Sequence, residues 1–120
     1  YRINNIAKIN NFIKKNEFNL CGFATNQSGV GRNYFSENQF WKCHNHIIEI
    51  CKKNRLKIDF TAVNFFKSET YYRKPNSGML DQIRCFYSVS RENIFFIGDK
   101  YTDEKAAKNA GIKYSFINKL

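Results

Sequence analysis

The chain has 120 residues and a mass of 14.2 kDa, and 42% of its residues are hydrophobic, including 12 phenylalanines. This length fits one domain, and this composition excludes a disordered, collagen-like or linker chain. The sequence contains no run of 18 apolar residues, so we expect no segment that spans a membrane. We therefore interpret residues 1–120 as a single core domain.

The charge balance is strongly basic. Twenty lysines and arginines against 10 acidic residues give a net charge of +10 and a pI near 9.6. A basic surface attracts polyanions, which makes nucleic acid one candidate partner. The lysines are scattered, however, whereas nucleic-acid-binding domains usually gather them on one face. We attribute the excess of lysine to AT-rich codons. A positive cleft that binds a small phosphorylated molecule is the second interpretation of the charge.

The cysteines indicate a reducing compartment. Cys21, Cys43, Cys51 and Cys85 form no Cys-x-x-Cys pair, and the chain does not open with a secretory leader. We therefore expect reduced, buried thiols and a cytoplasmic location.

A zinc site is not expected in the segment around Cys43. On a helix, the apolar residues from Phe40 to Cys51 recur as one core stripe that includes Cys43. His44 and His46 would lie about 200° apart around that helix and could not share one ion.

Helix and strand patterns alternate along the chain. Apolar residues at helical spacing predict the helices, and short apolar runs bounded by turn residues predict the strands. Ser36 with Gln39 predicts a capping box, and Gly111 fits the end of the last helix. The expected elements are a helix over 3–15, a strand over 18–24, a helix from the Ser36 cap to 53, a strand over 58–65, a helix over 78–87, a strand over 94–97, a helix from the Thr102 cap to 109, and a strand over 113–117.

This order of elements predicts an α/β fold: a three-layer, Rossmann-like parallel sheet with helices on both faces. Ligands of such sheets bind at the carboxyl ends of the strands. The loops after residues 24, 65 and 97 are therefore the candidate functional loops.

Each of these loops carries chemistry that suits a phosphoryl group. The first, 25–32, offers hydroxyl, amide and glycine N–H donors to an anion. The second contains two adjacent cations, Arg73 and Lys74, before a proline, and both side chains suit phosphoryl oxygens. The third has Asp99 at a strand end and Asp103 four residues later, a pairing that suits Mg²⁺. Asp103 could also serve only as an acid in the first turn of a helix.

Three motifs in this order, TNQSGVGRNYFSENQF, RKPNSGML and FIGDKYTDEKAAKNAGIK, resemble the haloacid dehalogenase (HAD) superfamily of phosphatases. Within it, the chain is most similar to the heptose 1,7-bisphosphate and histidinol-phosphate phosphatase group. The resemblance implies a HAD-like fold and a Mg²⁺-dependent phosphatase. It also implies roles for nine residues: Thr25 and Lys74 as catalytic residues, Asn26, Gln27, Ser28, Arg73 and Lys100 in substrate binding, and Asp99 and Asp103 at the metal.

The chain departs from the family pattern at its start. The family's nucleophile is the first aspartate of an Asp-x-Asp motif after the first strand, and no such motif occurs in these 120 residues. We interpret the chain as N-terminally incomplete, with the nucleophile upstream and the sheet's first strand missing. We therefore expect residues 1–120 alone to be inactive and poorly stable.

A second departure lies in residues 66–72, before Arg73. Some relatives carry Cys and His zinc ligands there, whereas this chain has FKSETYY. A structural zinc is therefore not expected. We expect this loop and Arg32 to set the specificity.

The leading expectation is a monomeric phosphatase for a small sugar phosphate, with no membrane partner. A polynucleotide 3′-phosphatase of the same superfamily is the alternative, since such enzymes share a TNQ loop and a YRKP-like motif. A non-catalytic remnant that keeps only a phosphate pocket is the third interpretation.

Overall fold

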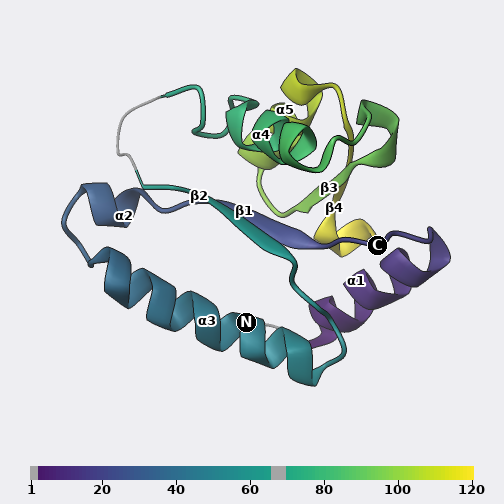
Figure 1. Cartoon of the computed structure of the whole chain (residues 1–120), viewed down its shortest axis with the longest axis horizontal. Coiled ribbons are helices and arrows are strands. Elements are labelled where there is room, and N and C mark those ends of the chain that lie inside the picture. The colour runs from purple at the N-terminus through teal and green to yellow at the C-terminus, as the bar shows by residue number, and fades with distance from the viewer. Residues whose placement is uncertain (1–2, 66–69) are drawn as a thin grey trace.

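The computed structural model describes residues 3–65 and 70–120 (Figure 1). In this part of the chain, no helix is long and apolar enough to cross a membrane. The helices and strands, in chain order, are α1 Ile3–Lys15, β1 Gly22–Asn26, α2 Ser28–Gly31, α3 Glu37–Lys53, β2 Phe60–Asn64, α4 Gly78–Tyr87, β3 Phe95–Gly98, α5 Tyr101–Ala110 and β4 Lys113–Phe116. Two short 3₁₀ helices, Arg91–Asn93 and Ile117–Lys119, complete the described elements.

The strands form two parallel pairs. β1 pairs with β2 from Gly22 opposite Phe60 to Asn26 opposite Asn64, and β3 pairs with β4 from Phe95 opposite Lys113. The sequence predicts a parallel sheet that lacks its first strand, and the described strands form two separate two-stranded sheets. The parallel α/β character is confirmed, but β1 and β3 have no strand between them in the described residues.

Helices cover the strand pairs from opposite sides. α3 runs along one side of β1 and β2, and α4 and α5 lie on the other (Figure 1). The α1/α3 side has its own core, centred on Ile6, Cys51 and Leu56. The α4/α5 side has a second core, centred on Leu80, Ala106 and Ala110. The layered arrangement therefore follows from two apolar clusters on opposite sides of the strands.

The first strand begins later than predicted. Residues 18–21 extend the apolar run, but the ladder starts at Gly22 because the Asp59 carboxylate accepts the Cys21 N–H, at 2.9 Å. At its other end, β1 continues to Asn26, because Thr25 and Asn26 pair with Val63 and Asn64. Thr25 and Asn26, which were predicted to begin the first functional loop, are thus the last two residues of β1.

The predicted capping box of α3 is confirmed, since Ser36 Oγ accepts the Gln39 N–H and the Gln39 side chain accepts the Ser36 N–H. The predicted core stripe is wrong at one position: Cys43 is exposed, and the neighbouring His44 is only 6% exposed. The His44 ring stacks on Phe40 and shares a 2.8 Å hydrogen bond with Thr61 Oγ1.

The start of α5 also differs from its prediction. Thr102 lies inside the helix, and Lys100 is the N-cap. Asp103, in the first turn, accepts the main-chain N–H groups of Asp99 and Lys100 on its Oδ2, each at 3.3 Å, and so provides a partner for two N–H groups at the start of the helix. The helix ends as predicted, at Gly111, whose φ of 72° is left-handed.

All four cysteines are free thiols. Cys51 is buried and Cys21 is half-buried, but Cys43 and Cys85 are exposed, so the expectation of buried thiols is wrong for those two.

Candidate functional site

Lys74 lies at the carboxyl ends of β1 and β3. Its ammonium group donates a 3.1 Å hydrogen bond to the Ala24 carbonyl of β1 and forms an ion pair with Asp103 of α5. The same nitrogen lies 5.5 Å from the ring centroid of Phe96 in β3. The Lys74 side chain is 11% exposed, so its charge is largely removed from solvent. One cation therefore links β1 to the segment of β3 and α5, which lies far from β1 in the sequence.

Asn26 fixes the backbone that carries this lysine. Its Oδ1 accepts the Lys74 N–H at 3.2 Å, and its Nδ2 donates to the Lys74 carbonyl at 3.3 Å. The oxygen and the nitrogen of the Asn26 amide thus both form hydrogen bonds with the Lys74 main chain. These two bonds hold the loop that contains Lys74 against the end of β1. The structure gives Asn26 a positioning contact, and the predicted contact with substrate stays a prediction.

Thr25 and Gln27 lie side by side after the Ala24 carbonyl that Lys74 contacts. Gln27 Nε2 donates to Thr25 Oγ1 at 2.9 Å, and the Thr25 hydroxyl donates a long hydrogen bond, 3.5 Å, to the Asn26 carbonyl. Ser28 begins α2, a single turn that the sequence patterns did not indicate. The three side chains are half-buried at the strand end.

Asp103 is the buried anion of the site, with 4% of its surface exposed. One carboxylate oxygen pairs with Lys74, and the other accepts the two backbone N–H groups at the end of β3. Gly98 makes this possible, because a Cβ at that position would lie 2.5 Å from Asp103 Oδ2. Because Gly98 has no side chain, the Asp103 carboxylate can reach the N–H groups of Asp99 and Lys100.

Asp99 and Lys100 are exposed at the end of β3. Asp99 presents its carboxylate at the same strand end as the buried Asp103, whereas Asp103 is already engaged by Lys74 and by two N–H groups. Within residues 3–65 and 70–120, no cluster of three or more His, Cys, Asp or Glu side chains is placed to hold a metal ion. The donors nevertheless fit Mg²⁺, which takes one or two protein carboxylates and completes its shell with water and phosphate oxygens. The predicted role of Asp99 as a ligand of Mg²⁺ stays a prediction.

The loop before α4 is held by hydrogen bonds to α4 and α5. Asp81 Oδ2 accepts from Ser77 Oγ at 2.7 Å and also from the Tyr71 hydroxyl. Asn109 of α5 donates to the Pro75 carbonyl at 2.8 Å, which fastens the loop beside Lys74. Arg73 is half-buried in this loop. Residues 66–69 of the predicted specificity loop lie outside the described residues.

Tyr114 is a neighbour of the site that the sequence patterns missed. Burial, and then the negative charges of Asp103, Glu104 and Asp99, raise the pKa of the Tyr114 hydroxyl to about 12. The ring packs edge-on against Phe96 and Phe116. No local pattern could reveal it, because Tyr114 reaches the carboxylates only through the pairing of β3 with β4.

The structure thus brings most of the predicted residues to one edge of the strands. A fixed cation, a hydroxyl and an exposed carboxylate converge there, and such a set can neutralise a phosphoryl group and hold a divalent ion. The predicted aspartate nucleophile has no counterpart, since no Asp-x-Asp motif occurs in the sequence.

Comparison with known proteins agrees with this fold. Residues 71–118 match a family model described as HAD-hydrolase-like. The D-glycero-alpha-D-manno-heptose-1,7-bisphosphate 7-phosphatase of Campylobacter jejuni is 35% identical over 93 residues, covering 78% of this chain and 54% of that protein. The histidine biosynthesis bifunctional protein HisB of Bacteroides fragilis is 31% identical over 96 residues, covering 78% of this chain and 26% of that protein.

A solved structure extends the comparison to three dimensions. The D,D-heptose 1,7-bisphosphate phosphatase of B. bronchiseptica, complexed with magnesium and phosphate, superposes with a TM-score of 0.77 at 23% identity. The match covers 93% of this chain and 61% of that one. The chain therefore spans little more than half the length of the heptose bisphosphate phosphatases it matches.

The parallel α/β architecture, with cation and carboxylates at the strand ends, defines the class of HAD-like phosphatase folds. Residues 71–118 are thus similar to HAD-like hydrolases, and two of the curated relatives are named heptose-1,7-bisphosphate 7-phosphatases.

Proposed function

We propose that this chain forms the greater part of a Mg²⁺-dependent phosphatase that removes a phosphoryl group from a small sugar phosphate of the heptose bisphosphate kind. The observation that carries the proposal is Lys74, a nearly buried cation held between the Ala24 carbonyl and Asp103. A cation fixed in a poorly solvated site stabilises phosphoryl charge more strongly than a mobile surface lysine does. The names of the curated relatives support the same substrate class.

In this proposal, Thr25 and Lys74 contact the phosphoryl oxygens. Asn26 keeps Lys74 in place, and Gln27, Ser28, Arg73 and Lys100 contact the rest of the substrate. Asp99 would ligate Mg²⁺, while Asp103 would orient the loop and Lys74. The ion would neutralise charge on the phosphoryl oxygens when bound.

The nucleophile is proposed to be an aspartate encoded outside these 120 residues. Its carboxylate oxygen would attack phosphorus, the P–O bond to the sugar would break, and the second aspartate of the same motif would give its proton to the departing sugar oxygen. Water would then hydrolyse the aspartyl phosphate and regenerate the carboxylate. On this basis residues 1–120 alone have no phosphatase activity. We also propose the cytoplasm as the compartment, because its four free thiols would stay reduced there.

The test is phosphate release by the protein of the full reading frame with Mg²⁺. A heptose 1,7-bisphosphate is compared with a 3′-phosphorylated DNA oligonucleotide, and a Lys74→Met variant is the matched control. Faster release from the sugar, lost in the variant, supports the proposal. Faster release from the oligonucleotide favours the polynucleotide 3′-phosphatase alternative. The net charge of +10 supports that alternative, because a basic protein attracts DNA.

No release from either substrate, together with binding of inorganic phosphate, would instead assign a non-catalytic phosphate-binding role.

A further inference from the structure

One carboxylate oxygen of Asp81 joins the two ends of the loop that carries Arg73 and Lys74. The Tyr71 hydroxyl donates a hydrogen bond to Asp81 Oδ2, and Ser77 Oγ donates to the same atom at 2.7 Å. Tyr71 precedes the two cations in the chain, and Ser77 follows them. We name Tyr71, Ser77 and Asp81 the loop clamp.

Further hydrogen bonds make this loop compact. The Gly78 N–H donates to the Tyr71 carbonyl at 2.9 Å, and the Arg73 N–H donates to the Thr70 carbonyl at 3.1 Å. The Thr70 carbonyl also accepts from Asn76 Nδ2 at 2.7 Å. Because the loop is short and tied in this way, a displacement at either end also moves the cations between its ends.

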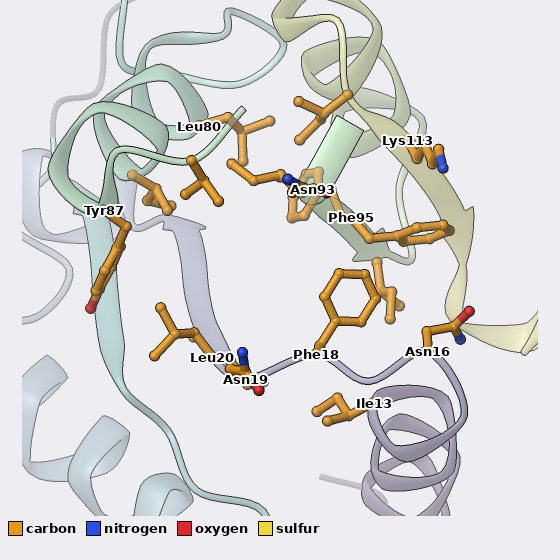
Figure 2. Close-up of a pocket in the computed structure, with 18 of the residues that line it drawn as sticks. Ile13, Asn16, Phe18, Asn19, Leu20, Leu80, Tyr87, Asn93, Phe95 and Lys113 are labelled. Atoms are coloured by element: carbon orange, nitrogen blue, oxygen red, sulfur yellow. The ribbon is translucent and has the colours of Figure 1, made fainter. Parts of the chain in front are cut away.

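The helix that carries Asp81 is firmly packed. Leu80, the preceding residue, is buried and forms a core with Ala106 and Ala110 of α5. Figure 2 shows Leu80 and Tyr87 of α4 on the wall of a cavity of about 790 Å³ that lies between β1 and β3. The loop clamp therefore fastens the loop to an element whose position the core determines.

The contacts of Ser77 distinguish the loop clamp from an ordinary helix cap. Ser77 is the N-cap residue of α4, and a serine in this place ordinarily accepts a main-chain N–H of the first helical turn. Here its hydroxyl donates to the Asp81 side chain instead. The hydrogen bond to Asp81 is also the main cause that raises the pKa of the Tyr71 hydroxyl above its ordinary value of 10. Two hydroxyls are thus used on one carboxylate, and hydrogen bonds to a charged acceptor are stronger than those between neutral groups.

The loop clamp complements the contacts that hold the middle of the loop. Asn26 binds the Lys74 main chain, and Asn109 donates to the Pro75 carbonyl at 2.8 Å. These contacts fasten the middle of the loop to β1 and α5, whereas Asp81 fastens its ends to α4. The Lys74 ammonium group is thus carried by a loop with three supporting elements.

We propose that Asp81 is a positioning residue of the candidate site: by binding both ends of the loop, it holds the Lys74 ammonium group in place for a phosphoryl group before the substrate binds. The same loop carries Arg73, so Asp81 positions both cations. The expected effect on turnover rests on the proposed function, and the expected effect on the closure of the loop does not.

Two substitutions separate the hydrogen bonds of Asp81 from its charge. Asp81→Asn keeps a side-chain oxygen that can accept from both hydroxyls, and it removes the negative charge, which by itself stabilises the start of a helix. Asp81→Ala removes the oxygen and the charge together. Gln82→Ala, at the next and exposed position of α4, is the matched control for a truncated side chain in this helix.

The protein of the full reading frame is assayed with Mg²⁺ and a heptose 1,7-bisphosphate, and kcat is expressed per folded molecule. We expect Asp81→Ala to lower kcat at least tenfold, whereas Asp81→Asn and Gln82→Ala should each retain at least half of it. An equal loss in Asp81→Asn and Asp81→Ala would overturn the proposal, because it would assign the effect to charge. An unchanged kcat in Asp81→Ala would overturn it as well.

The two hydroxyls test the same arrangement from the donor side. Tyr71→Phe and Ser77→Ala each remove one donor, and we expect each to lower kcat less than Asp81→Ala does. Combined with Asp81→Ala, either substitution should change kcat by less than a further twofold, because the shared acceptor is already absent. Losses that multiply independently would contradict the proposed contact.

The closure of the loop is measured without substrate, by the rate at which trypsin cleaves between Arg73 and Lys74. Relative to cleavage after Lys15, at the end of α1, we expect this rate to be at least fivefold higher in Asp81→Ala than in the wild-type protein or in Asp81→Asn. No rise, or an equal rise at both cleavage sites, would overturn the proposal, since the second result indicates general unfolding. If the wild-type protein releases no phosphate, the proposed function fails, and this measurement by itself decides whether Asp81 holds the loop.

Discussion

Lys74 and Asp103 form an ion pair that is nearly closed to solvent, with 11% and 6% of their side chains exposed. The two residues are separated by 29 positions and come from a loop and a helix. Asp103 also accepts two backbone N–H groups, and Lys74 also donates to the Ala24 carbonyl. The pair is therefore both the charge centre of the candidate site and a junction between β1 and α5.

Replacing Lys74 with methionine removes one partner of this pair. We expect the free energy of unfolding to fall by about 3 kcal/mol, because an uncompensated buried carboxylate remains. We also expect inorganic phosphate to lose its binding site. Urea denaturation and titration with phosphate measure the two effects.

The double variant Lys74→Met with Asp103→Asn is the control for this result. It removes both charges, so most of the lost stability should return while phosphate binding stays absent. Recovery of phosphate binding in the double variant would contradict the assignment of Lys74 as the anion-binding group.

Gly98→Ala should damage the site through a steric clash, not through charge. The new Cβ would lie 2.5 Å from Asp103 Oδ2, so the carboxylate must move and release Lys74. We expect phosphate binding to weaken at least tenfold. The matched control is Gly111→Ala, which strains a left-handed residue by about 1 kcal/mol at the far end of α5. Weakened phosphate binding in both variants would show that general instability is the cause.

His44 should make stability depend on pH. Burial lowers the pKa of His44 from its ordinary value of 6.5 in the folded chain. The unfolded chain therefore takes up the proton at higher pH, and stability is lost as the pH falls below 6.5. We expect His44→Gln to reduce this slope, because glutamine stays neutral. His46→Gln is the control at the other histidine, which is exposed, and denaturant unfolding from pH 5 to pH 8 compares the three proteins.

The cysteines should react in two classes with iodoacetamide at pH 8. Cys43 and Cys85 are exposed and should be alkylated in the native protein. Cys51 is fully buried, and burial, followed by the charge of Asp59, raises the pKa of Cys21 to about 11, so both should resist. Mass spectrometry should find two modified residues in the native protein and four in urea. Early modification of Cys21 would contradict the assigned environment.

Local patterns predicted the helices well. The bounds of α1 and α4 agree with their predictions, and the Ser36 capping box begins α3 as expected. These features depend on residues within four positions of each other, and the sequence displays such neighbours directly. The bounds of the strands differ from the predicted ones, because a strand begins where its hydrogen bonds to the neighbouring strand begin. The start of β1 depends on the contact between Cys21 and Asp59, which are separated by 38 positions.

The amino-acid sequence by itself predicted the alternation of helices and strands, the resemblance to HAD-like phosphatases and the residue types of the candidate site. Only the tertiary structure decided that Asn26 binds the Lys74 backbone, that Asp103 pairs with Lys74, that His44 is buried instead of Cys43, and that a cavity lies between β1 and β3. The physical reason is the same in each case. These relationships join segments far apart in the chain, and their energies depend on burial and distance, which arise only when the layers pack together.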